Sequence, residues 1–174
     1  MLRKILLALV LAVLVVLAIG LFLPREYTVS RSVTIRADKA RVHALTSDLS
    51  RWSEWSPWED DESLTKTLGP VTSGVGASQA WTSDSGDGRL VMTKSDPEEG
   101  IAYDLVFGPS GSESPAQGWM TYSGVGDAVV VTWGMSGEWD MPVLGGWVAR
   151  MADRMMGPDF DQGLKTLKHK AELR

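Results

Sequence analysis

The sequence predicts an α+β fold in which a curved antiparallel sheet is covered by a long C-terminal helix and preceded by an apolar N-terminal helix. Three observations predict it. Residues 5–23 contain no charged or polar side chain. Residues 63–140 alternate between strand-like runs and turns, and from residue 144 apolar residues recur at helical spacing. Only a helix lying across one face of a bent sheet buries both patterns together.

The apolar N-terminal run is long enough to span a bilayer. At 1.5 Å per residue it reaches about 28 Å, close to the roughly 30 Å of a hydrocarbon core. The run exceeds a typical signal-peptide core, which favours a retained anchor, although Ala18-Ile-Gly20 leaves a cleaved signal peptide as the alternative. We expect residues 1–25 to be a single-pass anchor in the cell membrane. The short N-tail favours a soluble part on the outer side, periplasmic or extracellular.

Residues 26–174 have the length of one domain with a single core. The chain carries a formal net charge of −5, which disfavours nucleic acid as a partner. It contains no cysteine, so disulfides, thiolate catalysis and cysteine metal sites are excluded.

The first elements of this domain follow from local patterns. Residues 26–35 alternate as a strand does, with Tyr27 and Val29 on the same face. Asp38 is a suitable N-cap for a helix whose apolar stripe includes Val42 and Leu45.

The middle and the end of the chain complete the pattern. Residues 78–83 and 89–95 form a predicted hairpin, residues 100–107 a further strand, and residues 108–118 a loop. A second hairpin joins residues 117–125 to 128–140 across Gly126-Asp127. The terminal helix has two apolar stripes that fall out of step at Gly157-Pro158, where proline kinks or restarts a helix. The stripes are Leu144, Val148, Met151 and Met155, then Phe160, Leu164, Leu167 and Ala171.

Three tryptophans lie within seven residues, at Trp52, Trp55 and Trp58. Pro57 pushes Ser56 away from the helical region, so the run is not one helix. Three large rings on a short connection must cover apolar surface. They seal the helix end against the sheet, line the mouth of a cavity, or lie at a membrane interface.

A helix crossing a strongly bent sheet leaves a gap, and that gap is the candidate binding site. Core packing is the alternative role for each candidate residue. The candidates are Trp55 and Trp58 at the mouth, Trp81, Tyr103, Trp119, Trp133 and Met135 on strands, and Met151 and Met155 on the helix.

Catalytic and metal motifs give no positive signal. No Gly-x-Ser-x-Gly elbow, His-Glu-x-x-His pair or phosphate-binding loop occurs in the sequence. The only histidines are His43 and His169, and neither lies near ligands suited to a metal. We therefore expect no catalytic residue, no metal and no cofactor.

At this point the residues resemble a known family over residues 27–173. The chain is similar to the SRPBCC superfamily, also called START-like or Bet v 1-like, and within it to the polyketide cyclase/dehydrase group. The resemblance depends on the order and spacing of several short motifs. They are Val33-Thr-Ile35, Trp52-x-x-Trp55-Ser-Pro-Trp58, Gly74-Val-Gly-Ala-Ser78 with Trp81, Tyr103-Asp-Leu-Val-Phe107, Val131-Thr-Trp133 with Gly137, and Gly157-Pro-Asp-Phe160 with Gly163-Leu-x-x-Leu167-Lys168.

The resemblance implies a helix-grip fold, a seven-stranded antiparallel sheet around a long C-terminal helix with a hydrophobic cavity between them. Its members include lipid and hormone carriers and aromatic-ring cyclases, so function does not follow from fold. Taken with the absence of a catalytic motif, this predicts a membrane-anchored START-like domain that binds a hydrophobic small molecule or lipid without turnover. The alternatives are a cyclase- or dehydratase-like enzyme, with Tyr103, His43 or Glu138 moving a proton, and a tethered interaction module whose protein partner is unknown.

Overall fold

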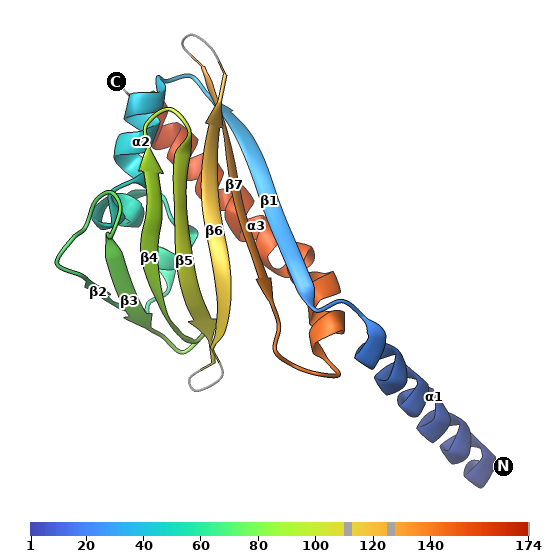
Figure 1. Ribbon diagram of the computed structural model, residues 1–174. Helices are drawn as coiled ribbons and strands as arrows, with labels where there is room; N and C mark the ends of the chain where they lie inside the picture. Colours follow the sequence, from blue (N-terminus) through green and yellow to red (C-terminus); the bar gives the residue numbers. More distant parts are fainter. Residues whose placement is uncertain (110–112, 125–127, 174) are drawn as a thin grey trace.

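The computed structural model describes residues 1–109, 113–124 and 128–173, and its main feature is a curved antiparallel sheet (Figure 1). The sheet has seven strands in the order β1-β7-β6-β5-β4-β3-β2. This confirms the predicted α+β helix-grip fold. The strands are β1 (Glu26–Ile35), β2 (Thr65–Leu68), β3 (Ser78–Thr82), β4 (Asp87–Asp96), β5 (Gly100–Gly108), β6 (Ser114–Ser123) and β7 (Val129–Glu138).

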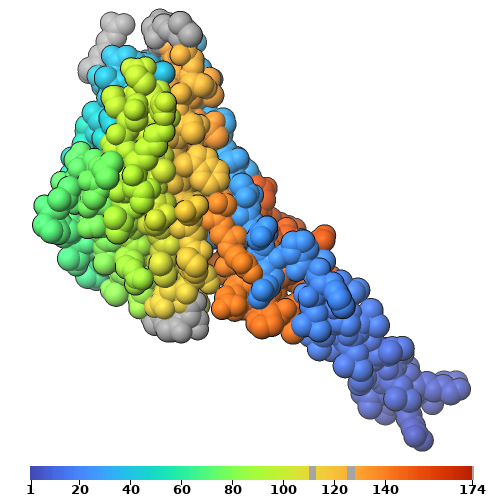
Figure 2. Space-filling model, viewed as in Figure 1, coloured from blue at the N-terminus to red at the C-terminus, as the bar shows by residue number. Residues whose placement is uncertain are grey.

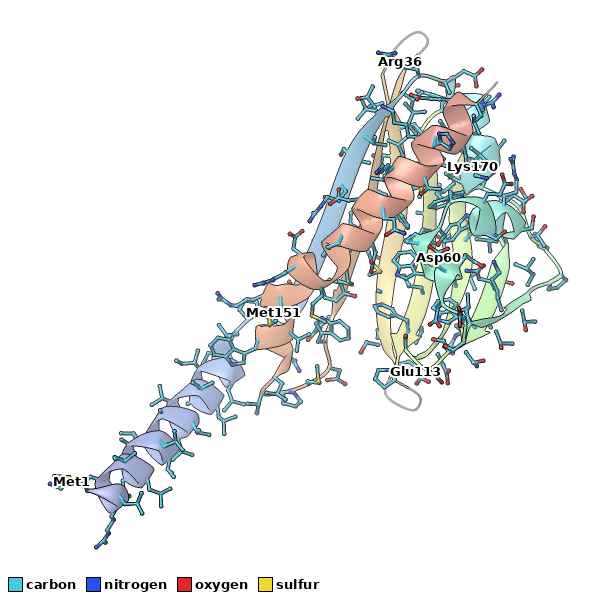
Figure 3. The ribbon with its side chains drawn as sticks, turned by 180° about the vertical axis from the view of Figure 1, so that it is seen from behind. Met1, Arg36, Asp60, Glu113, Met151 and Lys170 are labelled. Atoms are coloured by element: carbon cyan, nitrogen blue, oxygen red, sulfur yellow. The ribbon has the colours of Figure 1, made fainter. Side chains whose placement is uncertain are left out.

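The helices lie on the concave face of this sheet, apart from the first. Helix α3 runs diagonally across β1 and β7, and the two 3-10 helices cover the half of the sheet formed by β2 to β5 (Figure 3). The helices are α1 (Leu2–Phe22), α2 (Lys39–Thr46), η1 (Leu49–Glu54), η2 (Pro57–Asp60) and α3 (Gly145–Glu172).

Local chemistry explains where the short helices begin. The Asp38 side chain accepts a hydrogen bond from the Arg41 backbone N–H at 2.7 Å, which caps α2 as predicted. Asp48 caps η1 in the same way through Ser50. Pro57 occupies the first position of η2, where its missing N–H costs no hydrogen bond.

Helix α3 differs from the prediction of two stripes separated at Gly157-Pro158. It runs without interruption through Pro158. Its buried positions form one continuous stripe, because small residues face the sheet in the first half and larger ones in the second. The stripe comprises Ala149, Ala152, Met156, Phe160, Leu164, Leu167 and Ala171.

The predicted turn at 126–127 lies outside the described residues, as do residues 110–112 of the predicted loop 108–118. That loop is shorter than predicted, because β6 already begins at Ser114 and its Ala116 pairs with Leu105 of β5.

Helix α1 stands clear of the sheet and meets the rest of the chain only near its end (Figure 2). Its C-terminal end lies at the lower end of the sheet, the end where β1 begins and β5 finishes (Figure 1). It is the only helix in the described residues that is long and apolar enough to cross a membrane, with a mean hydropathy of 3.3. Such a helix is also typical of a signal sequence.

Candidate functional site

A cavity of about 500 Å³ lies between the concave face of the sheet and η2. It reaches the lower end of the sheet, where Ser85, Gly86 and Gly108 line it. Its volume lies in the range of pockets that enclose small organic ligands. The apolar and aromatic part of its lining comprises Trp52, Pro57, Trp58, Leu64, Trp81, Leu90, Tyr103, Leu105, Phe107, Met135 and Met156.

Strand register arranges this lining in rows across the concave face. The row nearest the lower end contains Phe107, Gly88, Trp81 and Lys66. The middle row contains Leu105, Leu90 and Gln79. Tyr103 and Met92 pair one row deeper. The cavity is therefore lined by rings near its lower end and closed by Tyr103 further in.

Two glycines make room for aromatic rings in these rows. A Cβ at Gly118 of β6 would lie 2.1 Å from the Tyr103 ring, so that ring lies directly over the glycine. A Cβ at Gly88 of β4 would lie 2.2 Å from Trp81. Both rings therefore lie flat against the sheet, and space for a ligand remains above them.

An aromatic cluster behind Tyr103 fixes the deep wall of the cavity. The Trp133 ring centroid lies 4.6 Å from Phe160 and 5.2 Å from each of Trp55 and Trp58, all in edge-to-face geometry. Such ring pairs stabilise by about 0.5–1.5 kcal/mol beyond the area they bury. A Cβ at Gly163 of α3 would lie 2.6 Å from Trp133, so α3 approaches the cluster closely there.

Tyr103 is completely buried, and its hydroxyl has one described partner. The Trp133 indole N–H donates to this oxygen at 2.9 Å. Because an indole nitrogen can only donate, the phenol oxygen is the acceptor and its own proton is left to point elsewhere. Burial raises the pKa of Tyr103 to about 12, so the phenol stays protonated at neutral pH.

The wall opposite the aromatic cluster is polar. Lys66 of β2 and Glu59 of η2 form an ion pair of 2.5 Å, and both side chains are largely buried. Gln79 of β3 is 9% exposed, and its Oε1 has no hydrogen-bond partner among the described residues. A buried polar atom without a partner is uncommon, because its desolvation costs about 1–3 kcal/mol.

Four of the nine predicted site residues line the cavity, namely Trp58, Trp81, Tyr103 and Met135. Trp55 and Trp133 lie behind this lining in the aromatic cluster. Trp55 differs from its predicted place at the mouth because its indole N–H donates to the Leu45 carbonyl of α2 at 3.0 Å.

The remaining three predicted residues lie outside the cavity. Trp119 is on the convex face of β6, where its ring covers Gly134 of the neighbouring strand. Met151 and Met155 are 53% and 56% exposed on the outer side of α3, since Ala149, Ala152 and Met156 occupy the face toward the sheet (Figure 3).

Sequence reasoning missed several lining residues. Gln79 and Lys66 are polar, and a search for apolar stripes passes over them. A signal for Gln79 was present, because it shares the alternation of Trp81 two residues further along the same strand. Met156 lies outside the predicted stripe, because apolar periodicity favours the stripe with Met151 and Met155 as the face toward the sheet.

The three residues predicted for an enzymatic alternative lie apart. Only Tyr103 lines the cavity. His43 belongs to α2, and its Nε2 is 3.2 Å from Ser95 Oγ of β4. Burial lowers the pKa of His43. Glu138 forms an ion pair with Arg25 at 3.1 Å at the end of β7. The geometry does not combine them into one catalytic group.

A second depression, of about 680 Å³, lies over β1, β7, β6 and β5. Polar and backbone atoms form much of its surface, including Glu26, Asp104, Gln117 and Glu138. It lacks the group of aromatic side chains that lines the cavity between the sheet and η2. Across the described residues, no group of three or more His, Cys, Asp or Glu side chains is arranged to hold a metal ion.

Comparison with protein families adds one match. A family model described as "Polyketide cyclase / dehydrase and lipid transport" matches residues 26–172, which contain every strand and α3. No curated protein matches the chain by sequence.

Solved structures share the fold at low sequence identity. Protein CV1439 from Chromobacterium violaceum has a TM-score of 0.62 and 16% identity over 84% of this chain and 98% of its own. Ara h 8.0201 has a TM-score of 0.57 and 11% identity, covering 84% of this chain and 97% of its own. DynU16, a putative protein in the dynemicin biosynthetic locus, has a TM-score of 0.52 and 16% identity over 82% of this chain and 46% of its own.

Proposed function

Since the chain belongs to the polyketide cyclase/dehydrase and lipid transport family, we propose that it binds a hydrophobic small molecule or lipid in the cavity beneath its sheet, without chemical turnover. The observation that carries this proposal is a partly open cavity of about 500 Å³ whose surface is formed mainly by aromatic and aliphatic side chains. Burial of apolar ligand surface there contributes about 25 cal/mol per Å² before ordering costs.

The chemistry of Tyr103 supports binding in preference to proton transfer. Its pKa, raised to about 12, makes it a poor base at neutral pH, whereas its protonated hydroxyl is a good hydrogen-bond donor. The other two residues considered for proton transfer, His43 and Glu138, are absent from the cavity lining.

The test uses the full chain, extracted gently and examined by native mass spectrometry. We expect a co-purifying mass, or a hydrophobic probe added after delipidation, to remain bound. Leu90→Trp inserts bulk into the middle row of the cavity and should abolish this binding. Val91→Trp is the matched control, because the neighbouring side chain is 44% exposed and faces away from the cavity. An empty native protein that takes up no probe would contradict the proposal.

We also propose that residues 1–25 are retained as a membrane anchor for the binding domain of residues 26–174, with that domain on the outer side. Close packing at the junction supports retention. A Cβ at Gly20 would lie 2.3 Å from the Val143 carbonyl, and a Cβ at Gly146 would lie 2.3 Å from Leu23. Cleavage after Gly20 would remove half of this contact.

The anchor proposal has its own experiment. The intact mass of protein extracted from membranes should equal that of the full chain, with the protein resisting release by high salt and carbonate. A shortened mass beginning after residue 20, in soluble protein, would show instead that the segment is a signal peptide. For protein that keeps the segment, protease protection in intact cells shows on which side of the membrane the domain of residues 26–174 lies.

A further inference from the structure

The polar groups in the cavity indicate what kind of hydrophobic molecule it takes. Most of the lining is apolar, yet two hydrogen-bonding groups face the enclosed space with capacity unused. The Gln79 side chain is nine-tenths buried, and its Oε1 has no partner among the described residues. The Tyr103 hydroxyl accepts from Trp133, and no described group accepts its proton.

The two groups lie on the same concave face, two strands apart. Gln79 of β3 pairs with Leu90 of β4, which pairs with Leu105 of β5, two residues from Tyr103. At about 4.8 Å between strands and about 7 Å for two residues along a strand, their backbones are separated by roughly 12 Å. One ligand in the cavity can therefore reach both.

The Tyr103 hydroxyl and the Gln79 amide also differ in their free hydrogen-bonding capacity. Tyr103 presents a proton, since its oxygen is engaged by the indole N–H. Gln79 presents an amide, which donates from nitrogen and accepts at oxygen. A ligand hydroxyl can donate to the unpaired Gln79 Oε1 or accept from Tyr103, whereas a carbonyl oxygen can only accept and suits Tyr103 alone.

Charge around the cavity disfavours an anionic ligand. Carboxylates of Glu59 and Asp61 line it, against one cationic side chain in the described lining, Lys66. Lys66 is already paired with Glu59 at 2.5 Å. Hydrogen bonds from Ser63 lower the pKa of Asp61, so this carboxylate is ionised at neutral pH. An acidic lining repels a carboxylate or phosphate headgroup.

We propose that the cavity selects an uncharged amphiphile, with a hydroxyl that donates to Gln79 Oε1 or a hydroxyl or carbonyl oxygen that accepts from Tyr103, over an acid of the same shape or a plain hydrocarbon. This inference depends on the proposed binding function and gives that function a ligand class. Gln79 Oε1 has no partner among the described residues, and the ligand hydroxyl supplies one. The desolvation cost of the buried amide is thereby offset only when a polar group enters.

The experiment compares three probes with the same ring system and chain. Delipidated full-length protein in mild detergent is mixed with equal amounts of 1-butylpyrene, 4-(1-pyrenyl)butanol and 4-(1-pyrenyl)butyric acid. Native mass spectrometry then reads the bound masses from one sample. Partition of the probes into detergent is the same for every variant, so changes in the bound ratios between variants report the protein alone.

After correction for the partition of each probe into detergent, measured without protein, we expect the native protein to bind the alcohol over the alkane by about three- to ten-fold, the range of one net hydrogen bond, and over the acid by at least as much. The single hydroxyl of the probe reaches one of the two groups at a time, so at least one of Gln79→Leu and Tyr103→Phe should lower the alcohol-to-alkane ratio. Gln79→Leu, similar in size, should also raise alkane occupancy. Met156→Ala is the control, because it removes apolar lining and should weaken all three probes alike.

The outcomes separate the two proposals. If no probe binds any form of the protein, the binding function itself is wrong. If all three bind equally to the native protein, or if the ratio is unchanged in both Gln79→Leu and Tyr103→Phe, the cavity binds apolar molecules and the inferred selectivity is overturned. Preference for the acid would overturn it as well.

Discussion

Trp133 and Tyr103 are joined by a hydrogen bond of 2.9 Å from the indole N–H to the phenol oxygen. Trp133 belongs to the aromatic cluster that packs α3 and η2 onto the sheet, and Tyr103 lines the cavity. The bond therefore connects the stability of the core to the orientation of a ligand-facing hydroxyl. Both side chains are at most 3% exposed.

Trp133→Phe should lower the free energy of unfolding by about 2–4 kcal/mol, because it leaves the Tyr103 oxygen without its donor and opens a void in the cluster. Urea titration followed by circular dichroism measures this loss. Trp119→Phe is the matched control, since that ring lies on the convex face, and we expect a loss of less than about 1 kcal/mol there. Equal losses would contradict the central position of Trp133.

Gly118→Ala should destabilise the protein through Tyr103. The added Cβ would lie 2.1 Å from the Tyr103 ring, which must then shift into the cavity and away from Trp133, and forced repacking of this kind costs about 1–3 kcal/mol. Gln117→Ala, one residue earlier and facing outward, should change stability by less than about 0.5 kcal/mol. The same urea titration checks both, and an unaffected Gly118→Ala protein would show that the ring does not lie over this glycine.

Met156→Ala should weaken binding of a neutral hydrophobic probe by about three- to ten-fold, since it removes apolar atoms from the cavity lining. Met155→Ala should leave binding unchanged, because that side chain is 56% exposed on the opposite side of α3. Probe occupancy by native mass spectrometry distinguishes the two. The reverse result would mean that α3 is rotated by about one residue relative to the sheet.

The contrast between these two methionines also explains what the sequence predicts well and where it fails. The helix, its length and its position over the sheet follow from apolar periodicity. The choice of face does not, because α3 presents two stripes and the one richer in large apolar residues, Leu144 to Met155, is the outer one. Ala149 and Ala152 face the sheet instead, and small residues give a weak periodic signal.

The strands show a similar limit of sequence prediction, here in the choice of sheet face. Alternation correctly groups Trp133 with Met135 on the concave face of β7. Trp119 follows the same rule and falls on the convex face, because it alternates with Met120, which is completely buried. The sequence predicts Trp119 as a pocket residue because it is an aromatic residue on a strand that could face the cavity. The ring is instead accommodated on the outside by Gly134 of the adjacent strand, a pairing that depends on register and not on local sequence.

His43 should make stability depend on pH below about 6.5. Burial lowers its pKa in the folded state, although the charge of Asp96 opposes this, and its Nδ1 has no described partner. The unfolded chain then takes up a proton more readily, so stability is complete above the unfolded pKa and falls as the pH drops below it. The groups facing the ring are Ser95 and the Tyr122 ring.

His43→Gln should therefore lose less stability than the native protein between pH 7.5 and pH 5.5, measured by urea titration at each pH. Carboxylates that titrate at lower pH contribute equally to both proteins over this interval. An identical loss in the variant would assign the pH dependence to other groups.

Lys66→Met should destabilise the protein by about 1–3 kcal/mol, a value reduced from that of a fully buried pair because some solvent reaches the site. The change leaves the Glu59 carboxylate largely buried without its cation, at the point where η2 is held to β2. Urea titration should show recovery of much of this loss in the Lys66→Met, Glu59→Gln double variant, since the unpaired charge is then removed. A double variant less stable than Lys66→Met alone would mean that the carboxylate has a second stabilising partner. Because η2 also carries Trp58 to the cavity wall, the single variant should weaken probe binding, and the double variant should restore it.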